Sequence, residues 1–403
     1  MSGFGSAAAF RSPGTPVVYE ASQPYQPWGQ QHNKWVLLPV LGLVALAIPG
    51  LIVVGAISTN IGGGAVLVGA MAAVLPVVGV VAAFLWVDRW EPEPSRLLLA
   101  AFLWGAGVSV LGAAIVNDSA AVLGERVLGN GGGDLAGAVI SAPIAEEAFK
   151  GAFLVGLLRL RRWEFDGVVD GIVYAGLVAA GFAFTENILY FGRAFATDGL
   201  VGEAGSVITV FMIRGVLSPF AHPVFSVMIG VAVGLAARRR NPIGRLALPV
   251  AGYLAAVALH ALWNASAGLG VLPAFYAVIM VPLFGGLVAL VVWQRRREQR
   301  VVAGQLAGFA GAGWIAPSEV PLLASLAGRR GWRLAVRRRA GGQAAEAVRD
   351  YQNAVTELAF ISDRVQRGTV GEETGRWHHD TLVALMAARD RAVRAPSGTR
   401  RSS

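Results

Sequence analysis

The sequence predicts an all-α integral membrane protein with about eight transmembrane helices, and three observations lead to this fold class. The chain has 403 residues, of which 55% are hydrophobic and only 15% are charged, with a mean hydropathy of +0.57. Soluble domains carry about 25% charged residues. Long apolar segments recur along the first three quarters of the chain. Runs of arginine follow the fourth, sixth and eighth of these segments.

Each predicted span is an apolar segment of the length that a bilayer requires, roughly 20 residues. The eight segments are 35–57, 64–87, 97–117, 135–158, 167–190, 206–237, 246–266 and 271–293. The sixth is long enough either to tilt or to be interrupted near Pro219 and Pro223, because proline removes a backbone donor from a helix.

The arginine runs predict the orientation. They lie at 159–162, 238–245 and 295–300, whereas the connections at 118–134, 191–205 and 267–270 are acidic or weakly charged. Arginine-rich connections stay in the cytoplasm. We therefore expect a multi-pass protein of a bacterial cytoplasmic (inner) membrane with both termini in the cytoplasm; the preference for arginine over lysine is typical of a GC-rich bacterial genome.

Three regions differ in composition. Residues 1–34 are rich in Pro, Gly, Ser and Gln and are predicted to be a disordered cytoplasmic segment. Residues 35–293 form the membrane domain. Residues 294–403 hold 19 basic and 10 acidic residues and account for the whole net charge of +9. This tail shows helical spacing at 343–362 and 379–394, and we expect it to face the lipid bilayer rather than nucleic acid, because it carries no nucleic-acid-binding signature.

Ionisable residues lie inside the predicted spans, where a charge costs at least about 2.5–3.5 kcal/mol. From helix geometry, Glu146, His222 and His260 lie about 20, 24 and 22 Å from the nearest arginine run. Three different helices thus bring polar groups to one depth, as a site would require. The polar residues of these spans are Glu146, Glu147, Lys150, Asp170, Glu186, Arg214, His222, His260 and Asn264.

The spacing of these residues indicates a polar intramembrane site, with side chains placed to contact one another. Lys150 follows Glu146 by four residues and Glu147 by three, so one ammonium group reaches both carboxylates. An ionised glutamate beside water is a general base. His260 and Asn264 share a helical face that suits donors to an oxyanion.

Three other residues keep simpler interpretations. Phe182 precedes Glu186 by one helical turn. Asp170 either caps the fifth helix or supports the site, and Arg214 is expected to pair with an acidic residue.

At these residues the sequence resembles the PrsW family of intramembrane proteases. The resemblance runs from Asp88 to Asn264. Its motifs are Asp-Arg-Trp-Glu-Pro-Glu-Pro at 88–94, Glu-Glu-Ala-Phe-Lys at 146–150, Asp-Gly at 170–171, Gly-Phe-Ala-Phe-Thr-Glu-Asn at 181–187, a histidine at 222 and His-Ala-Leu-Trp-Asn at 260–264.

The resemblance implies a helical core like that of the CAAX prenyl endopeptidases, and it implies roles for the polar residues. Glu146 would activate water, and Glu147 would be oriented by Lys150. Glu186 and His222 would hold or polarise the water. His260 and Asn264 would bind the oxyanion. The implied substrate is a membrane-spanning protein, which in PrsW proteases is an anti-sigma factor.

The sequence leaves the metal question open. Glu146, His222 and His260 would make a three-ligand zinc site with one open position, but the HExxH helix is absent. We favour a metal-free, glutamate-driven mechanism with no cofactor, and zinc is the alternative.

Two other functions remain. Intramembrane carboxylates and histidines also mark proton- or ion-coupled transporters, although no inverted repeat is evident. A scaffold that has lost activity is the third interpretation, and the retained polar residues argue against it. The chain has no cysteine, which excludes disulfides and thiolate chemistry.

Overall fold

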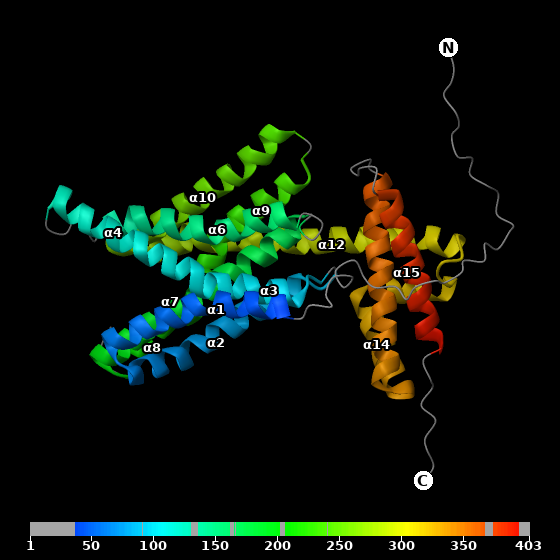
Figure 1. Cartoon of the computed structure of the whole chain (residues 1–403), viewed down its shortest axis with the longest axis horizontal. Helices are drawn as coiled ribbons and strands as arrows, with labels where there is room; N and C mark the ends of the chain where they lie inside the picture. The colour runs from blue at the N-terminus through cyan, green and yellow to red at the C-terminus, as the bar shows by residue number, and fades with distance from the viewer. Residues whose placement is uncertain are drawn as a thin grey trace, which may run out of the picture.

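The computed structural model describes residues 37–394 apart from 91, 130–135, 162–164, 166, 202–205, 240 and 367–373. The described residues form helices and no strand, which confirms the all-α fold class. The predicted disordered segment 1–34 lies outside the described residues. Figure 1 shows a bundle of roughly aligned helices and, at one end of it, a separate group formed by the tail.

Seven of the described helical stretches are long and apolar enough to cross a membrane, which confirms a polytopic membrane protein. They are α1 (Leu37–Ile61), α2 (Gly63–Val87), α3–η1–α4 (Ser95–Leu103, Trp104–Ser109, Val110–Leu128), α7 (Val168–Asp198), α8–η3–α9 (Val207–Phe211, Met212–Leu217, Ala221–Ala237), α10 (Pro242–Gly268) and α11–η4–α12 (Leu272–Phe275, Tyr276–Met280, Val281–Gly311).

The predicted span at 135–158 is also helical, as η2 (Ala136–Ser141) followed by α6 (Ala142–Leu160). It does not count among the seven because α6 carries Glu146, Glu147, Lys150 and Arg159. The difference from the eight expected spans therefore arises at the helix that holds Glu146, Glu147 and Lys150 of the candidate site.

The helix that contains the last predicted span is longer than the apolar segment. The apolar segment was expected at 271–293, and α12 continues to Gly311 without interruption. Arginine, glutamine and glutamate favour helix almost as well as alanine. Charge alone therefore marks where the apolar part of α12 ends, and the helix runs on into the tail.

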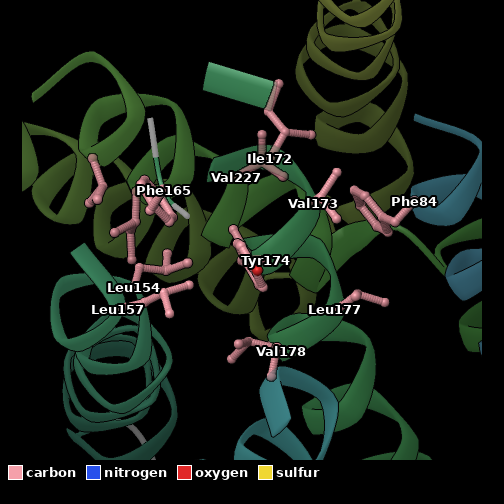
Figure 2. Packing of buried hydrophobic residues seen from close by; sticks show 14 of the residues in the cluster. Phe84, Leu154, Leu157, Phe165, Ile172, Val173, Tyr174, Leu177, Val178 and Val227 are labelled. Carbon is pink, nitrogen blue, oxygen red and sulfur yellow. The ribbon is translucent and has the colours of Figure 1, made fainter. Parts of the chain in front are cut away.

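The central helix of the bundle is α7. Of its most apolar stretch, 78% is buried, and it packs against α2, α3, α6 and α9. Figure 2 shows Tyr174 of α7 at the middle of this core, with Phe84 of α2 and Leu154 of α6 among its neighbours. Since α7 carries Phe182 and Glu186, the best-packed element of the fold holds part of the candidate site.

Glycines let α7 and α9 approach each other closely. A Cβ atom added to Gly171 of α7 would lie 2.0 Å from the carbonyl oxygen of Gly230 in α9, and one added to Gly230 would lie 2.1 Å from the carbonyl oxygen of Gly171. Such distances leave no room for a side chain on either helix. Small residues at helix interfaces are the usual means of tight association in membranes.

The sixth span is interrupted near Pro219, which is one of the two arrangements that the sequence left open. A π-helical turn, η3, ends at Leu217, Ser218 has non-helical dihedral angles (φ −124°, ψ 33°), and α9 begins at Ala221. The residue before a proline is disfavoured in the α region, and here that residue is Ser218. The interruption separates Arg214 in η3 from His222 in α9.

The tail forms a second helical core around the end of α12. Its helices are η5 (Pro317–Glu319), α13 (Val320–Leu323), α14 (Leu326–Gln366) and α15 (Thr374–Arg394). Both helices expected from spacing are present but are longer than predicted, and α14 bends at Gly341, where φ is +88°. Figure 1 shows α14 and α15 crossing the direction of α12. Trp90, from the turn after α2, is buried among the tail's apolar side chains.

We predict that Gly230→Ala destabilises the bundle. The added methyl group would meet backbone atoms of α7, and overpacking of this kind costs about 1–3 kcal/mol. Thermal unfolding of the purified chain in detergent should show a lower midpoint. Gly156→Ala in α6 is the matched control, since nothing lies within 4 Å of its added Cβ and alanine is the better helix former. Equal midpoints for Gly230→Ala and the wild type would contradict the proposed role of this contact.

Candidate active site

Four helices bring their polar side chains to one cluster inside the bundle. The cluster spans α6, α7, α9 and α10 with a contribution from η3, and its members are Glu146, Glu147, Lys150, Glu186, Arg214, His222, Ser226 and His260. The convergence expected from depth along the helices is therefore present in the folded chain.

Lys150 contacts both the glutamates of its own helix α6 and His222 of α9. Its ammonium nitrogen lies 3.3 Å from Glu146 Oε2, 2.9 Å from Glu147 Oε1 and 3.3 Å from His222 Nδ1. It also lies 3.8 Å from the centre of the Phe182 ring, a cation–π contact. With 1% of its surface exposed, Lys150 is buried and neutralises charge where water does not reach.

Glu147 is fully occupied as a hydrogen-bond acceptor. Its Oε1 accepts from Lys150 at 2.9 Å and faces His260 Nδ1 at 3.1 Å, while its Oε2 accepts from the Ser226 hydroxyl at 2.7 Å. Its exposed fraction is 0%. A carboxylate with three donors is held as the anion and has little capacity to bind water, so Glu147 orients its neighbours.

Glu146 is far less constrained. Among the described residues it accepts one hydrogen bond, from Lys150, and its Oε2 lies 3.9 Å from His260 Nε2. Its exposed fraction is 7%. Glu146 thus keeps acceptor capacity for water, and the two adjacent glutamates differ in what they can do.

Glu186 is held by a guanidinium and an imidazole. Arg214 Nη2 forms an ion pair with Glu186 Oε2, and Arg214 Nε donates to Asn187 Oδ1 at 2.8 Å. The Arg214 guanidinium also stacks over the Tyr190 ring at 3.8 Å. The expectation that Arg214 pairs with an acidic residue is confirmed, and the partner is Glu186.

The partners of His222 fix its tautomer. Its Nε2 lies 2.8 Å from Glu186 Oε2, and its Nδ1 lies 3.3 Å from the Lys150 ammonium. A carboxylate only accepts and an ammonium only donates. We therefore assign the proton to Nε2 and a lone pair to Nδ1, so that His222 is neutral and links Glu186 to Lys150.

His260 has one ring nitrogen engaged and one available. Its Nδ1 faces the ionised Glu147, which requires a proton on Nδ1. Its Nε2 points toward Glu146. The ring stacks on Phe225 with centroids 4.8 Å apart and an interplanar angle of 22°, so its orientation is set both by packing and by a hydrogen bond.

Two predicted site residues lie outside this cluster. Asn264 lies one turn beyond His260 on α10 and donates to the Ala138 carbonyl oxygen of η2 at 2.8 Å. Asp170 lies at the start of α7, where its Oδ2 accepts from the Gly167 amide at 2.8 Å. The structure therefore favours the capping interpretation of Asp170.

Sequence reasoning missed Ser226 and Phe225. Ser226 follows His222 by four residues, so a second polar residue on the same helical face was a usable signal. Phe225 gave no such signal, because a phenylalanine in an apolar span is ordinary.

The donor set has the composition of a zinc site but is not free to bind one as arranged. Glu146, His222 and His260 each offer a ligand atom within 4.8 Å of the others, and His₂Glu is a known catalytic set. However, Nε2 of His222 already faces Glu186, and its Nδ1 faces the Lys150 ammonium. Zinc would have to displace one of these partners, so we derive no step through a metal.

Comparisons with known proteins agree with the geometry. Residues 93–287 match the family described as "PrsW family intramembrane metalloprotease". Protease PrsW of Geobacillus kaustophilus is 33% identical over 165 residues, which cover 41% of this chain and 65% of that protein. Protease PrsW of Bacillus subtilis is 28% identical over 165 residues, which cover 41% and 67%. No solved structure matches this chain.

The spanning helices and the buried carboxylate–histidine cluster define a polytopic membrane protein with a polar intramembrane site. Residues 93–287, which match the PrsW family, contain every member of that cluster. The alignment with the Geobacillus protein covers less than two thirds of that relative's length.

We predict that Ser226→Ala loosens the site. The change leaves the buried Glu147 Oε2 without a donor, and an unpaired buried acceptor costs about 1–3 kcal/mol. The thermal midpoint should fall. Ser119→Ala on α4 is the control, since Ser119 is exposed and donates only to the Ile115 carbonyl oxygen of its own helix. If both variants unfold at the wild-type temperature, the Ser226 contact does not stabilise the cluster.

Proposed function

We propose that this chain is an intramembrane endopeptidase that cleaves a membrane-spanning protein with a glutamate-activated water. The observation that supports this most is the contrast between the adjacent glutamates. Glu147 has three donors, whereas Glu146 has one and lies beside the available Nε2 of His260. Family membership and the names of the relatives support the same reaction.

In the proposed reaction Glu146 takes a proton from water, and the hydroxide oxygen attacks the carbonyl carbon of the scissile peptide. A tetrahedral intermediate forms, with negative charge on the former carbonyl oxygen. Glu146 then returns the proton to the amide nitrogen, the C–N bond breaks, and an amine and a carboxylic acid leave. A positioned acid–base group of this kind contributes typically 10²–10⁴-fold to the rate.

The other members of the cluster stabilise these steps. Lys150 lies 3.3 Å from Glu146 and favours its ionised form. Glu186 and His222 hold the ammonium group from the other side. We propose that His260 and Asn264 bind the oxyanion, as the family resemblance implies. His260 can donate from Nε2 only after it gains a second proton, and the adjacent Glu147 carboxylate stabilises that imidazolium.

The proposal also covers the substrate and the membrane in which the protein lies. A membrane-spanning anti-sigma factor is the first substrate to test. We place the chain in the bacterial cytoplasmic membrane with both termini in the cytoplasm. In support, Arg159 lies in the last turn of α6, Arg238 directly follows α9, and the arginines at 295–300 lie in the part of α12 that leads into the tail.

We predict that Glu146→Gln abolishes cleavage. The amide cannot accept the proton from water, so cleavage should fall at least about 100-fold, while the amount of the protein in the membrane stays constant. Comparative membrane proteomics of cells expressing wild type or variant would reveal a single-span protein truncated only by the wild type. Glu125→Gln, an exposed glutamate on α4, is the matched control. Normal cleavage by Glu146→Gln would remove Glu146 from the mechanism.

We also predict that cleavage does not depend on zinc. The purified chain should contain far less than one zinc per molecule by elemental analysis, and it should keep its activity after treatment with a strong chelator. This follows from the two partners that already occupy the nitrogens of His222. A stoichiometric zinc ion that disappears in His222→Ala, together with activity restored only by zinc, would establish the metal mechanism instead.

A further inference from the structure

A polar cavity lies between the membrane domain and the tail, away from the candidate active site. Its volume is about 360 Å³, and it is bounded on one side by the turn after α2 and the start of α3, and on the other side by α14. Pockets for small ligands begin at about 300 Å³. The polar residues that line it are Asp88, Arg89, Glu93, Arg329, Arg333 and Asn353.

Arg329 is buried at this cavity with one nitrogen unsatisfied. The residue is 3% exposed. Its Nε donates to the Leu323 carbonyl oxygen at 2.9 Å, and its Nη1 donates to the Gln352 carbonyl oxygen at 3.2 Å and to Thr356 Oγ1. Its Nη2 has no hydrogen-bond partner. A buried donor without an acceptor is costly and rare in folded proteins. Because Arg329 lines the cavity, a small shift of its side chain toward the cavity would let this nitrogen donate to an acceptor from outside the chain.

Three guanidinium groups line the cavity against two carboxyl groups, those of Asp88 and Glu93. Arg329, Arg333 and Arg89 all line it, and the described residues place no carboxylate within ion-pair distance of these three side chains. Burial and the neighbouring Arg333 lower the pKa of Arg329 to about 10. Burial raises the pKa of Asp88 to about 7, so this carboxyl group is an incomplete counter-charge near neutral pH.

We propose that this cavity binds a phosphate group, held by Arg329 and Arg333 of α14 and by Arg89 of the membrane domain. Guanidinium groups bind phosphate oxygens through paired, charge-assisted hydrogen bonds. The phosphate has two sources, an anionic lipid headgroup at the membrane edge or a soluble phosphorylated molecule. In either case the ligand would join the tail to the membrane domain.

The test uses the full chain and two phosphate probes. In detergent, radiolabelled inorganic phosphate is titrated at constant ionic strength against chloride. In a second arm, the chain is placed in vesicles of phosphatidylcholine with or without phosphatidic acid, and its thermal midpoint is measured. We expect saturable phosphate binding with one site per chain, or a midpoint raised by phosphatidic acid. The first result identifies a soluble source, and the second identifies a lipid headgroup.

Variants separate the cavity from general electrostatic attraction. Arg333→Gln and Arg89→Gln should each weaken binding about tenfold or more, as expected for loss of one charged hydrogen-bond donor. Arg338→Gln is the matched control, since it removes the same charge from an exposed position of α14. Arg89 is exposed, so Arg89→Gln decides the question if Arg333→Gln does not fold. No saturable response in either arm, or an equal loss in Arg338→Gln, would overturn the proposal.

Discussion

The buried ammonium of Lys150 is the interaction on which the rest of the site depends. Two adjacent glutamates in a membrane helix repel each other and lose their hydration. Lys150 lies within 3.3 Å of both, and the ring of Phe182 covers it. The same nitrogen reaches His222, and through it Glu186 and Arg214. The Lys150 ammonium thus neutralises the carboxylates of its own helix and also links α6 to α7 and α9. The same contacts compensate the buried charge and hold the helices together.

The helix break at Ser218 explains how the Glu186 carboxylate contacts one residue before the break and one after it. Because Ser218 leaves the helix before Pro219, Arg214 and His222 lie on separate segments, and both reach Glu186. An unbroken α-helix would place residues eight apart about 12 Å from each other along its axis. The close approach of Gly171 and Gly230 keeps α9 against α7 on the other side of His222. The site therefore depends both on the break before α9 and on the close glycine contact that holds α9 against α7.

The sequence alone predicted where the spanning helices lie and how deep in them the polar residues are. Both can be read from the lengths of the apolar segments and the positions of the charged residues along the chain. The sequence favoured Glu146 over Glu147 as the proposed base only through family resemblance. The physical reason, three donors on Glu147 against one on Glu146, depends on which faces of four helices meet. Ser226, Phe225 and the partner of Arg214 were set by the same tertiary contacts. The sequence did not predict the end of the helix α12, because polarity marks where an apolar span ends and not where a helix ends.

The same cluster sets a limit on how stable the site can become. Each further donor placed on Glu146 would lower the free energy of the folded protein, as the contacts of Ser226 and His260 do for Glu147. Each would also occupy a lone pair that a general base must offer to water. A cluster built only for stability would satisfy both glutamates alike. The folded chain saturates one and leaves the other beside the available nitrogen of His260. That asymmetry is costly in an apolar bundle, and a reaction at Glu146 accounts for it better than a purely structural role does.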